Sequence, residues 1–284
     1  MAIAENLGAL RTRIKSWRQQ NEVIALVPTM GNLHEGHLSL VQKARELADR
    51  VVVSIFVNPL QFNDKQDLSD YPRTLNEDIQ LLSELDCELI FTPTEEMIYP
   101  NGMASLTKVI VPGVDDKLCG KGRPGHFDGV ATVVTKLFNM VQPDIAIFGE
   151  KDYQQLMLIK KLVADLNLSV DVIGVPTKRH ESGLAMSSRN SLLNQKQLVQ
   201  APLIYKTLLS MKQAIEEDGL TDFHQLCATA KEELQKAGLE PEYVDIRRAN
   251  DLELANANDK HIRIFVAARL GSVRLIDNIA CDLA

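Results

Sequence analysis

The sequence lacks several features that would point directly to a class of protein. Its 31 basic side chains against 38 acidic ones give a net charge of −7, whereas proteins that coat nucleic acid ordinarily carry a basic excess. Its four cysteines lie far apart and form no Cys-x-x-Cys pair, so we expect reduced thiols and no metal centre. No run of 18 apolar residues occurs, and the N-terminus reads as an amphipathic helix rather than a secretory signal. We therefore expect a cytoplasmic protein without nucleic-acid or membrane partners.

What the sequence does contain is an alternation of short β-branched runs and longer helical patterns. The expected strands are Val23–Val27, Val51–Val57, Glu88–Thr92, Thr107–Val111, Asp144–Phe148 and Val170–Val175. The expected helices between them are Leu38–Arg50, Thr74–Leu85, Val130–Met140 and Tyr153–Leu166. This rhythm is typical of βαβ units, so it predicts an α/β fold with a Rossmann-like, doubly wound parallel sheet of five or six strands.

The pattern changes after Pro176, where a polar loop leads into a different order of elements. Helical patterns follow at Lys196–Glu217 and Phe223–Ala237, and then strand candidates at Tyr243–Arg247, Ile262–Ala268 and Val273–Ile276. We therefore predict two domains. Residues 1–176 would form the nucleotide- and substrate-binding domain, and residues 177–284 a smaller α+β domain that acts as a lid over the site.

The segment Pro28–His37 follows the first expected strand and enters the first expected helix. Ligands of doubly wound sheets bind beyond the carboxyl ends of the strands, which is where this segment lies. Gly31 and Gly36 allow a tight turn and a close approach of a ligand to the backbone, and the helix N-terminus favours anions. His34 and His37, three residues apart, would donate hydrogen bonds to a phosphate.

Other interpretations of this segment are weaker. His34 could serve as a helix-entry residue and His37 as a surface residue, although the glycine spacing and the strand-loop-helix context argue against this. A zinc site of the His-Glu-x-x-His kind needs histidines four residues apart, whereas His34 and His37 are three apart, so the spacing argues against zinc. The glycine-lysine string Gly120–Gly122 lacks the other residues of a Walker A loop, so nucleotide binding is assigned to the histidine segment.

Two further polar segments are suited to phosphates. Met186–Asn190 offers hydroxyls and a guanidinium, although its serines and asparagine could instead cap the helix beyond them. Gly149–Asp152 follows the expected strand Asp144–Phe148, and Lys151 within it could neutralise a polyphosphate.

Two other segments are suited to a small polar substrate. Asn58–Phe62 supplies neutral amides after the second strand, where a plain turn is the alternative interpretation. Cys119–Val130 is a basic, glycine-rich loop from which Arg123 could reach a phosphate or a carboxylate. His126 in that loop is as consistent with a structural role as with a catalytic one.

Five segments together resemble the pantothenate synthetase (pantoate–β-alanine ligase) family in their order and their residues, over essentially the whole chain: Pro28–His37, Asn58–Phe62, Cys119–Val130, Phe148–Gln155 and Met186–Asn190. The histidine segment alone resembles the wider nucleotidylyltransferase superfamily. The family resemblance implies that a pantoate carboxylate attacks the α-phosphorus of ATP, giving pantoyl adenylate and pyrophosphate, and that the amine of β-alanine then displaces AMP to give pantothenate. It also implies Mg²⁺ with the ATP, and a homodimer.

The resemblance assigns roles by position. The catalytic residues would be His37 as proton donor, His34, Lys151, Ser187, Ser188 and Arg189. The ATP-binding residues would be Met30, Gly31, Asn32, Leu33, His34, Glu35, Gly36, His37, Gly149, Glu150, Lys151, Asp152, Lys178, Met186, Ser187, Ser188 and Arg189. The substrate-binding residues would be Gln61 and Gln155, with Asn58, Tyr71 and Arg123 as secondary contacts.

Two rival functions fit part of the pattern. A nucleotidylyltransferase acting on another small acid or a phosphorylated acceptor would also use the histidine segment. A nucleotide sensor without catalysis, or an RNA-binding relative of the synthetases, would need only the fold, although the acidic charge argues against RNA.

Overall fold

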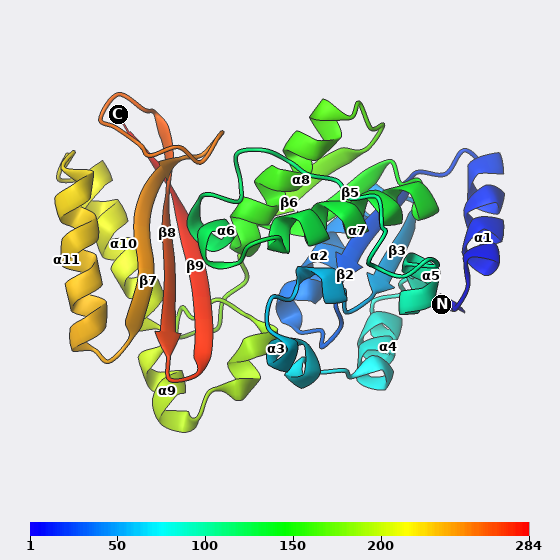
Figure 1. Ribbon diagram of the computed structural model, residues 1–284, viewed down its shortest axis with the longest axis horizontal. Helices are drawn as coiled ribbons and strands as arrows, with labels where there is room; N and C mark the ends of the chain where they lie inside the picture. Colours follow the sequence, from blue (N-terminus) through cyan, green and yellow to red (C-terminus); the bar gives the residue numbers. More distant parts are fainter. Residues whose placement is uncertain (284) are drawn as a thin grey trace. The chain divides into compact units, whose positions relative to one another are not determined.

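The computed structural model describes residues 1–283 and divides into two compact units, drawn in Figure 1. The first unit consists of Met1–Asp116, Gly120–Glu150 and Gln155–Pro176. The second consists of Lys117–Cys119, Lys151–Gln154 and the segment from Thr177 onward. The predicted boundary at residue 176 places both short segments, Lys117–Cys119 and Lys151–Gln154, in the first domain instead. The lid role predicted for the second domain stays a prediction.

A six-stranded parallel sheet forms the centre of the first unit. Its strands are β1 (Ala2–Ala4), β2 (Ile24–Thr29), β3 (Arg50–Ile55), β4 (Leu89–Phe91), β5 (Ile145–Gly149) and β6 (Asp171–Val175). Its helices are α1 (Leu7–Gln19), α2 (Glu35–Leu47), α3 (Lys65–Asp70), α4 (Leu75–Glu84), α5 (Glu95–Ile98), α7 (His126–Val141) and most of α8 (Tyr153–Asp165). The 3₁₀ turn η1 (Pro59–Gln61) also lies in this unit, whereas the short helix α6 (Leu118–Gly122) and the 3₁₀ turn η2 (Glu150–Asp152) are each divided between the two units.

The strand order is β1-β4-β3-β2-β5-β6, and every neighbouring pair is parallel. From β4 to β6 the order is that of a doubly wound fold, with β2 as its first strand. The order along the chain reverses between β2 and β5, and a ligand crevice forms at such a switch point. The predicted fold class is therefore confirmed.

One predicted strand is wrong and one strand was missed. Thr107–Val111 is a loop in which Ile110 is 63% exposed and the N–H of Val109 donates to the Thr132 hydroxyl rather than to a neighbouring strand. The sixth strand is instead β1, which pairs with β4 at the edge of the sheet. Three residues are too few to show the alternation by which a strand is recognised in a sequence.

The two faces of the sheet are covered by different helices. α2 packs on β2, β3 and β5 through its buried residues Leu40, Val41 and Ala44. α7 packs on β2 and on α1, and Phe127 and Leu137 are among its buried side chains. Each fully buried side chain of this size contributes roughly 1.5–3 kcal/mol. The core thus fixes both helix layers on the sheet.

The second unit is a three-stranded antiparallel sheet with helices on it. Its elements are η3 (Ser188–Leu192), α9 (Gln195–Gln200), α10 (Leu203–Glu216), α11 (Phe223–Lys236), β7 (Glu240–Arg248), β8 (His261–Leu270) and β9 (Val273–Asp282). β8 is the central strand, α11 packs on β7, and α10 packs on β8 and β9. Figure 1 shows these helices alongside the three strands. The predicted α+β character is confirmed.

The single helix predicted for Lys196–Glu217 is two helices. The break falls at Pro202, which lacks the N–H that a continuous helix needs. α10 therefore starts anew at Leu203. α9 has its own start signal, a capping box in which Asn194 and Gln197 each accept a backbone N–H of the other.

Hydrogen bonds explain why the short segments Lys117–Cys119 and Lys151–Gln154 belong to the second unit. The Gln154 amide donates to the Lys117 carbonyl at 2.8 Å and accepts from the N–H of Cys119 at 3.0 Å, which joins the two segments. The Lys117 ammonium pairs with Glu253 at 2.7 Å. The Tyr153 hydroxyl donates to the Ala249 carbonyl at 3.0 Å.

Within residues 1–283, no helix is long and apolar enough to cross a membrane. The four cysteines, all in the described part of the chain, are free thiols. Burial raises the pKa of Cys87 to about 11, which keeps this thiol protonated near neutral pH.

Candidate active site

Three loops of the first unit leave the carboxyl edge of the sheet from adjacent strands. Met30–His34 follows β2, Asn58–Gln61 follows β3, and Glu150 follows β5. β2 lies between β3 and β5, so its loop starts at the switch point of the sheet. These positions agree with those from which the sequence predicted a ligand site.

The loop after β2 is held by a carboxylate that the sequence analysis did not single out. Asp78 of α4 is 1% exposed, and its two oxygens accept the N–H groups of Asn32 at 3.0 Å and Leu33 at 2.8 Å. The Thr74 hydroxyl donates to the same carboxylate at 3.2 Å. A buried carboxylate is stable only with such donors, so Asp78 and the loop depend on each other.

Gly31 is required by the backbone of this loop. Its φ of +80° lies in the left-handed region, and a Cβ there would lie 2.9 Å from the Asp78 carboxylate and 3.1 Å from the Ile55 side chain. The next residue, Asn32, is also left-handed at φ +50°. The turn therefore brings two successive N–H groups onto Asp78.

His34 and His37 lie side by side at the start of α2, with ring centroids 4.2 Å apart. His34 is the N-cap of α2, and its Nδ1 accepts the N–H of Gly36 at 3.1 Å. A neutral imidazole that accepts at Nδ1 carries its proton on Nε2, so Nε2–H of His34 is the group that can donate to a ligand. The helix-entry interpretation of His34 and the ligand-binding one are thus compatible.

Gln61 is positioned through its side chain by its neighbours. Its amide accepts from Asn58 at 3.2 Å and donates to the Met30 sulfur at 2.7 Å. Asn58 is 1% exposed, accepts from the Tyr99 hydroxyl at 2.6 Å and donates to the Gly129 carbonyl at 3.1 Å. Asn58 therefore holds the Gln61 side chain in place, because the hydrogen-bonding groups of its own amide are all bonded to other parts of the protein.

The backbone carbonyl of Gln61 accepts a second set of hydrogen bonds. His126 contacts it through Nδ1 at 2.7 Å, and Arg123 donates to it at 3.2 Å. Arg123 also donates to Nε2 of His126 at 3.0 Å, so the proton of that imidazole lies on Nδ1. The structural interpretation of His126 fits these contacts. Tyr71 lies edge-on to Phe62, with ring centroids 5.6 Å apart.

The segment after β5 divides between the units. Gly149, Glu150 and the half-buried Gln155 belong to the first unit, whereas Lys151 and Asp152 belong to the second. The Lys151 ammonium lies 3.5 Å from the Asp152 carboxylate. The residues predicted to bind ATP here are therefore shared between the two units.

The second unit carries the remaining predicted residues on one loop. The N–H of Met186 donates to the Lys178 carbonyl at 2.9 Å, which closes the loop at its base. The Ser187 hydroxyl accepts the N–H of Arg189 at 3.3 Å and caps η3, so the capping interpretation holds for Ser187. Ser188 and Arg189 are half-buried. A serine that accepts from the backbone still has its O–H to donate.

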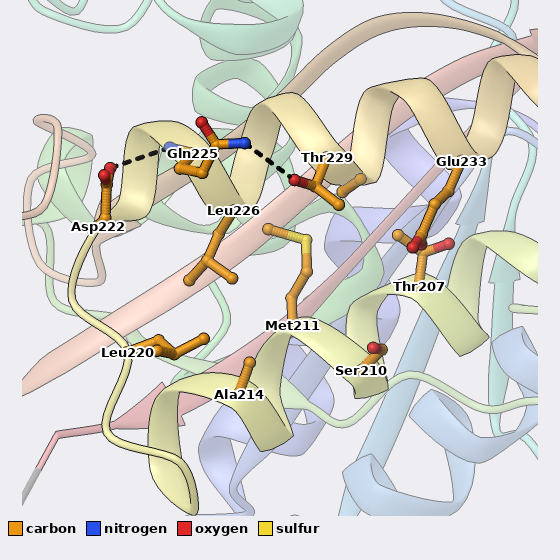
Figure 2. Close-up of a pocket in the computed structure, with 11 residues that line it drawn as sticks. Thr207, Ser210, Met211, Ala214, Leu220, Asp222, Gln225, Leu226, Thr229 and Glu233 are labelled. Carbon is orange, nitrogen blue, oxygen red and sulfur yellow. Dashed lines mark hydrogen bonds between the residues drawn. The ribbon is translucent and has the colours of Figure 1, made fainter.

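A pocket of about 360 Å³ lies elsewhere in the second unit, between α10 and α11. Figure 2 shows Met211 and Leu226 pointing into it, with Asp222 and Glu233 near its ends. Its described lining contains these two carboxylates and no basic side chain or predicted site residue. Such a lining is unsuited to ATP or to a carboxylate substrate.

Sequence reasoning missed the residues that hold the site segments in place. They are Asp78, Tyr99, Arg263, Asp277 and Asn278, all of which are buried. A lone acidic or amide residue in a helix or strand gives no motif. The one usable signal was the polar character of Asp277 and Asn278 in a strand whose neighbouring positions are apolar.

A doubly wound sheet with a glycine- and histidine-bearing loop at its switch point defines a nucleotide-binding α/β protein. The sequence matches the family described as Pantoate-beta-alanine ligase over residues 2–280. The chain belongs to this family.

Relatives named pantothenate synthetase match along the full chain. One from Ectopseudomonas mendocina is 51% identical over 284 residues, which cover 100% of this chain and 99% of the relative. One from Pseudomonas aeruginosa strain UCBPP-PA14 is 52% identical over 283 residues, with 100% of both chains covered.

Solved structures agree with this result. Pantothenate synthetase from Thermus thermophilus superposes with a TM-score of 0.91 at 40% identity, covering 98% of this chain and 99% of that one. Pantoate-beta-alanine ligase from Francisella tularensis, complexed with beta-gamma ATP and beta-alanine, gives a TM-score of 0.82 at 40% identity, covering 98% and 97%.

Proposed function

We propose that this chain condenses pantoate with β-alanine at the expense of ATP, through pantoyl adenylate, and releases AMP and pyrophosphate. The observation that carries the proposal is the β2–α2 loop at the switch point of the sheet, in a chain of the pantoate–β-alanine ligase family. A carboxylate is a poor acylating group, so AMP is installed as the leaving group before the amine attacks. The site must therefore stabilise phosphate charge in both steps.

We propose that the first unit binds the nucleotide through the loop Met30–His37. Nε2–H of His34 and the ring of His37 donate to the phosphates, and His37 supplies the proton as pyrophosphate leaves. The N–H groups at the start of α2 form the positive end of its helix dipole, which further stabilises the phosphate charge.

We propose that Gln61 and Gln155 bind the pantoate, and that Gln61 also contacts β-alanine. Gln61 makes two hydrogen bonds through its side chain and two through its backbone carbonyl, which fixes its position before substrate arrives and reduces the entropy lost on binding. Asn58 contributes by fixing Gln61 rather than by touching substrate, because its amide is used within the protein. Tyr71 and Arg123 complete the surroundings of that site.

We propose that the second unit supplies Lys151, Ser187, Ser188 and Arg189 as donors to the phosphates. Lysine and arginine neutralise the charge that develops on the leaving group, and the hydroxyls orient individual oxygens. Lys178 contributes through its backbone. The second unit would thereby act as a lid whose closing completes the charge-stabilising set.

We propose that Mg²⁺ accompanies ATP. Its preferred ligands are oxygens, commonly one or two carboxylates together with substrate phosphates, and the carboxylate of Glu150, the residue after β5, would be of that kind. Such an ion would neutralise part of the phosphate charge, and His34 and Lys151 would donate to the phosphates beside it.

The decisive assay incubates the protein with ATP, Mg²⁺, pantoate and β-alanine, omits one component at a time, and measures AMP and pyrophosphate. We expect pyrophosphate without β-alanine but not without pantoate, and AMP with pantothenate only when all are present. Release of AMP that ignores pantoate would reject this function. A nucleotidylyltransferase, the less favoured alternative, would instead leave a nucleotidylated acceptor.

We further propose that the protein is a cytoplasmic homodimer, as the family resemblance implies. Light scattering during gel filtration should then give twice the 31.6 kDa mass of one chain. A single-chain mass at micromolar concentration would contradict the dimer.

A further inference from the structure

Two segments that we propose to bind ATP, around Lys151 and from Lys178 to Arg189, are attached to two adjacent residues of β9, Asn278 and Asp277. Asp277 and Asn278 are each 4% exposed and adjacent in sequence. A charged residue and an amide are rarely buried in a strand unless each is paired, so their partners indicate what they do.

Asn278 holds the Lys151 segment. Its side-chain N–H donates to the Lys151 carbonyl at 2.9 Å, and its side-chain oxygen accepts from the Arg263 guanidinium at 2.5 Å. Arg263 in turn lies over the Tyr153 ring, with its guanidinium carbon 3.7 Å from the ring centroid. Residues 151 and 153 are thus both fixed by side chains of β8 and β9.

Asp277 holds the other segment. Its carboxylate accepts hydrogen bonds from both terminal nitrogens of Arg179, at 2.5 and 2.9 Å. The guanidinium carbon of Arg179 lies 3.6 Å from the centroid of the Tyr205 ring. Arg179 also donates to the Gly183 carbonyl at 3.2 Å. Burial raises the pKa of Asp277, while the Arg179 and Lys151 cations act in the opposite direction.

We propose that Asp277 and Asn278 are positioning residues that set the Lys151 and Lys178–Arg189 segments in register with each other for catalysis on ATP. The proposal rests on the ATP roles given above to Lys151 and Arg189. One rigid strand that fixes both segments keeps the spacing of their donors constant. A displacement of about 1 Å in such groups can cost on the order of a hundredfold in rate.

The sharpest variant is Asn278→Asp, which preserves size and the acceptor for Arg263. It replaces the donor to the Lys151 carbonyl by an oxygen, so two acceptors face each other. We expect kcat/KM for ATP to fall roughly tenfold or more, with KM for β-alanine within about twofold. Asn258→Asp, in an exposed turn of the same unit, makes the same charge change and should leave both constants unaltered.

A double-mutant cycle with Lys151→Ala separates positioning from general stability. If Asn278 acts through Lys151, Asn278→Asp should change kcat/KM for ATP by less than about twofold once Lys151 is absent. An equal loss in both backgrounds would overturn the proposal, as would wild-type kinetics of the single variant. Asn278→Ala repeats the cycle without the added charge if the aspartate variant folds poorly.

Hydrogen exchange gives a readout that does not depend on activity. Amides of residues 149–156 should exchange faster in Asn278→Asp than in the wild type, while those of β7 and α11 keep their rates. If Lys151→Ala has normal activity, the ATP role of Lys151 fails, and exchange still decides whether Asn278 holds the segment. Unchanged exchange at residues 149–156 would refute that hold.

Discussion

The two units anchor the segments that we propose to bind ATP in different ways. In the first unit, one carboxylate, Asp78, accepts two successive N–H groups of the β2–α2 loop from a helix only 46 positions further along. In the second, Asn278 reaches the Lys151 carbonyl across 127 positions. The first anchor is part of a local strand-loop-helix unit, whereas the second ties a segment between β5 and α8 to a distant sheet. Lys151 therefore belongs to the second unit although it follows β5 closely in the chain.

Removing the proposed proton donor of the first unit should have the largest effect. We expect His37→Ala to slow adenylate formation by roughly a hundredfold or more, because it removes a positioned proton-transferring and charge-stabilising group. Pyrophosphate release in the presence of pantoate and absence of β-alanine measures this step. His224→Ala, on an exposed face of α11, is the matched control and should be normal. Turnover near that of the wild type would remove His37 from the mechanism.

Weakening the local anchor should cost less. Asp78→Asn retains the shape but turns an acceptor into a donor that faces the N–H groups of Asn32 and Leu33. We expect a loss of about 1–3 kcal/mol in the free energy of unfolding, and a rise in KM for ATP. Urea melts and initial rates measure the two quantities. Glu77→Gln, exposed on the adjacent position of α4, should alter neither; an equal effect there would show that charge alone matters.

The smallest effect should come from the scaffold of the second unit. Asn194→Ala removes the capping box of α9. N-caps of this type contribute about 1 kcal/mol to the free energy of unfolding. Thermal unfolding should shift while kcat stays constant, because α9 carries none of the assigned donors. A large loss of activity would instead link α9 to catalysis.

Motifs and periodicity predicted the sheet and the loops of the site well. The histidine segment, Gln61 and the Ser187 loop lie on the elements where the sequence placed them, because strand-helix alternation and short polar loops are local signals. Two parts could not be found in this way. The edge strand β1 is too short for a period, and the loop 107–111 has a strand-like composition without a pairing partner.

The supporting residues were also beyond reach of the sequence. Asp78 and Asn278 act through hydrogen bonds to backbone groups far along the chain, and such pairs leave no spacing to recognise. For the same reason, the place of Lys151 in the second unit was missed, since the residue follows β5 closely. Only three-dimensional contacts assign it.

The attachment of residues 151–154 to β9 also bears on the order in which the protein is made. A nascent chain that has been synthesised past Val175 contains all six strands of its parallel sheet. Its Lys151 segment, however, cannot form its hydrogen bond until Asn278 has been synthesised. Contacts of such long sequence separation form late and slowly. During synthesis, the nucleotide-binding sheet would thus be complete about a hundred residues before its lysine is locked in place.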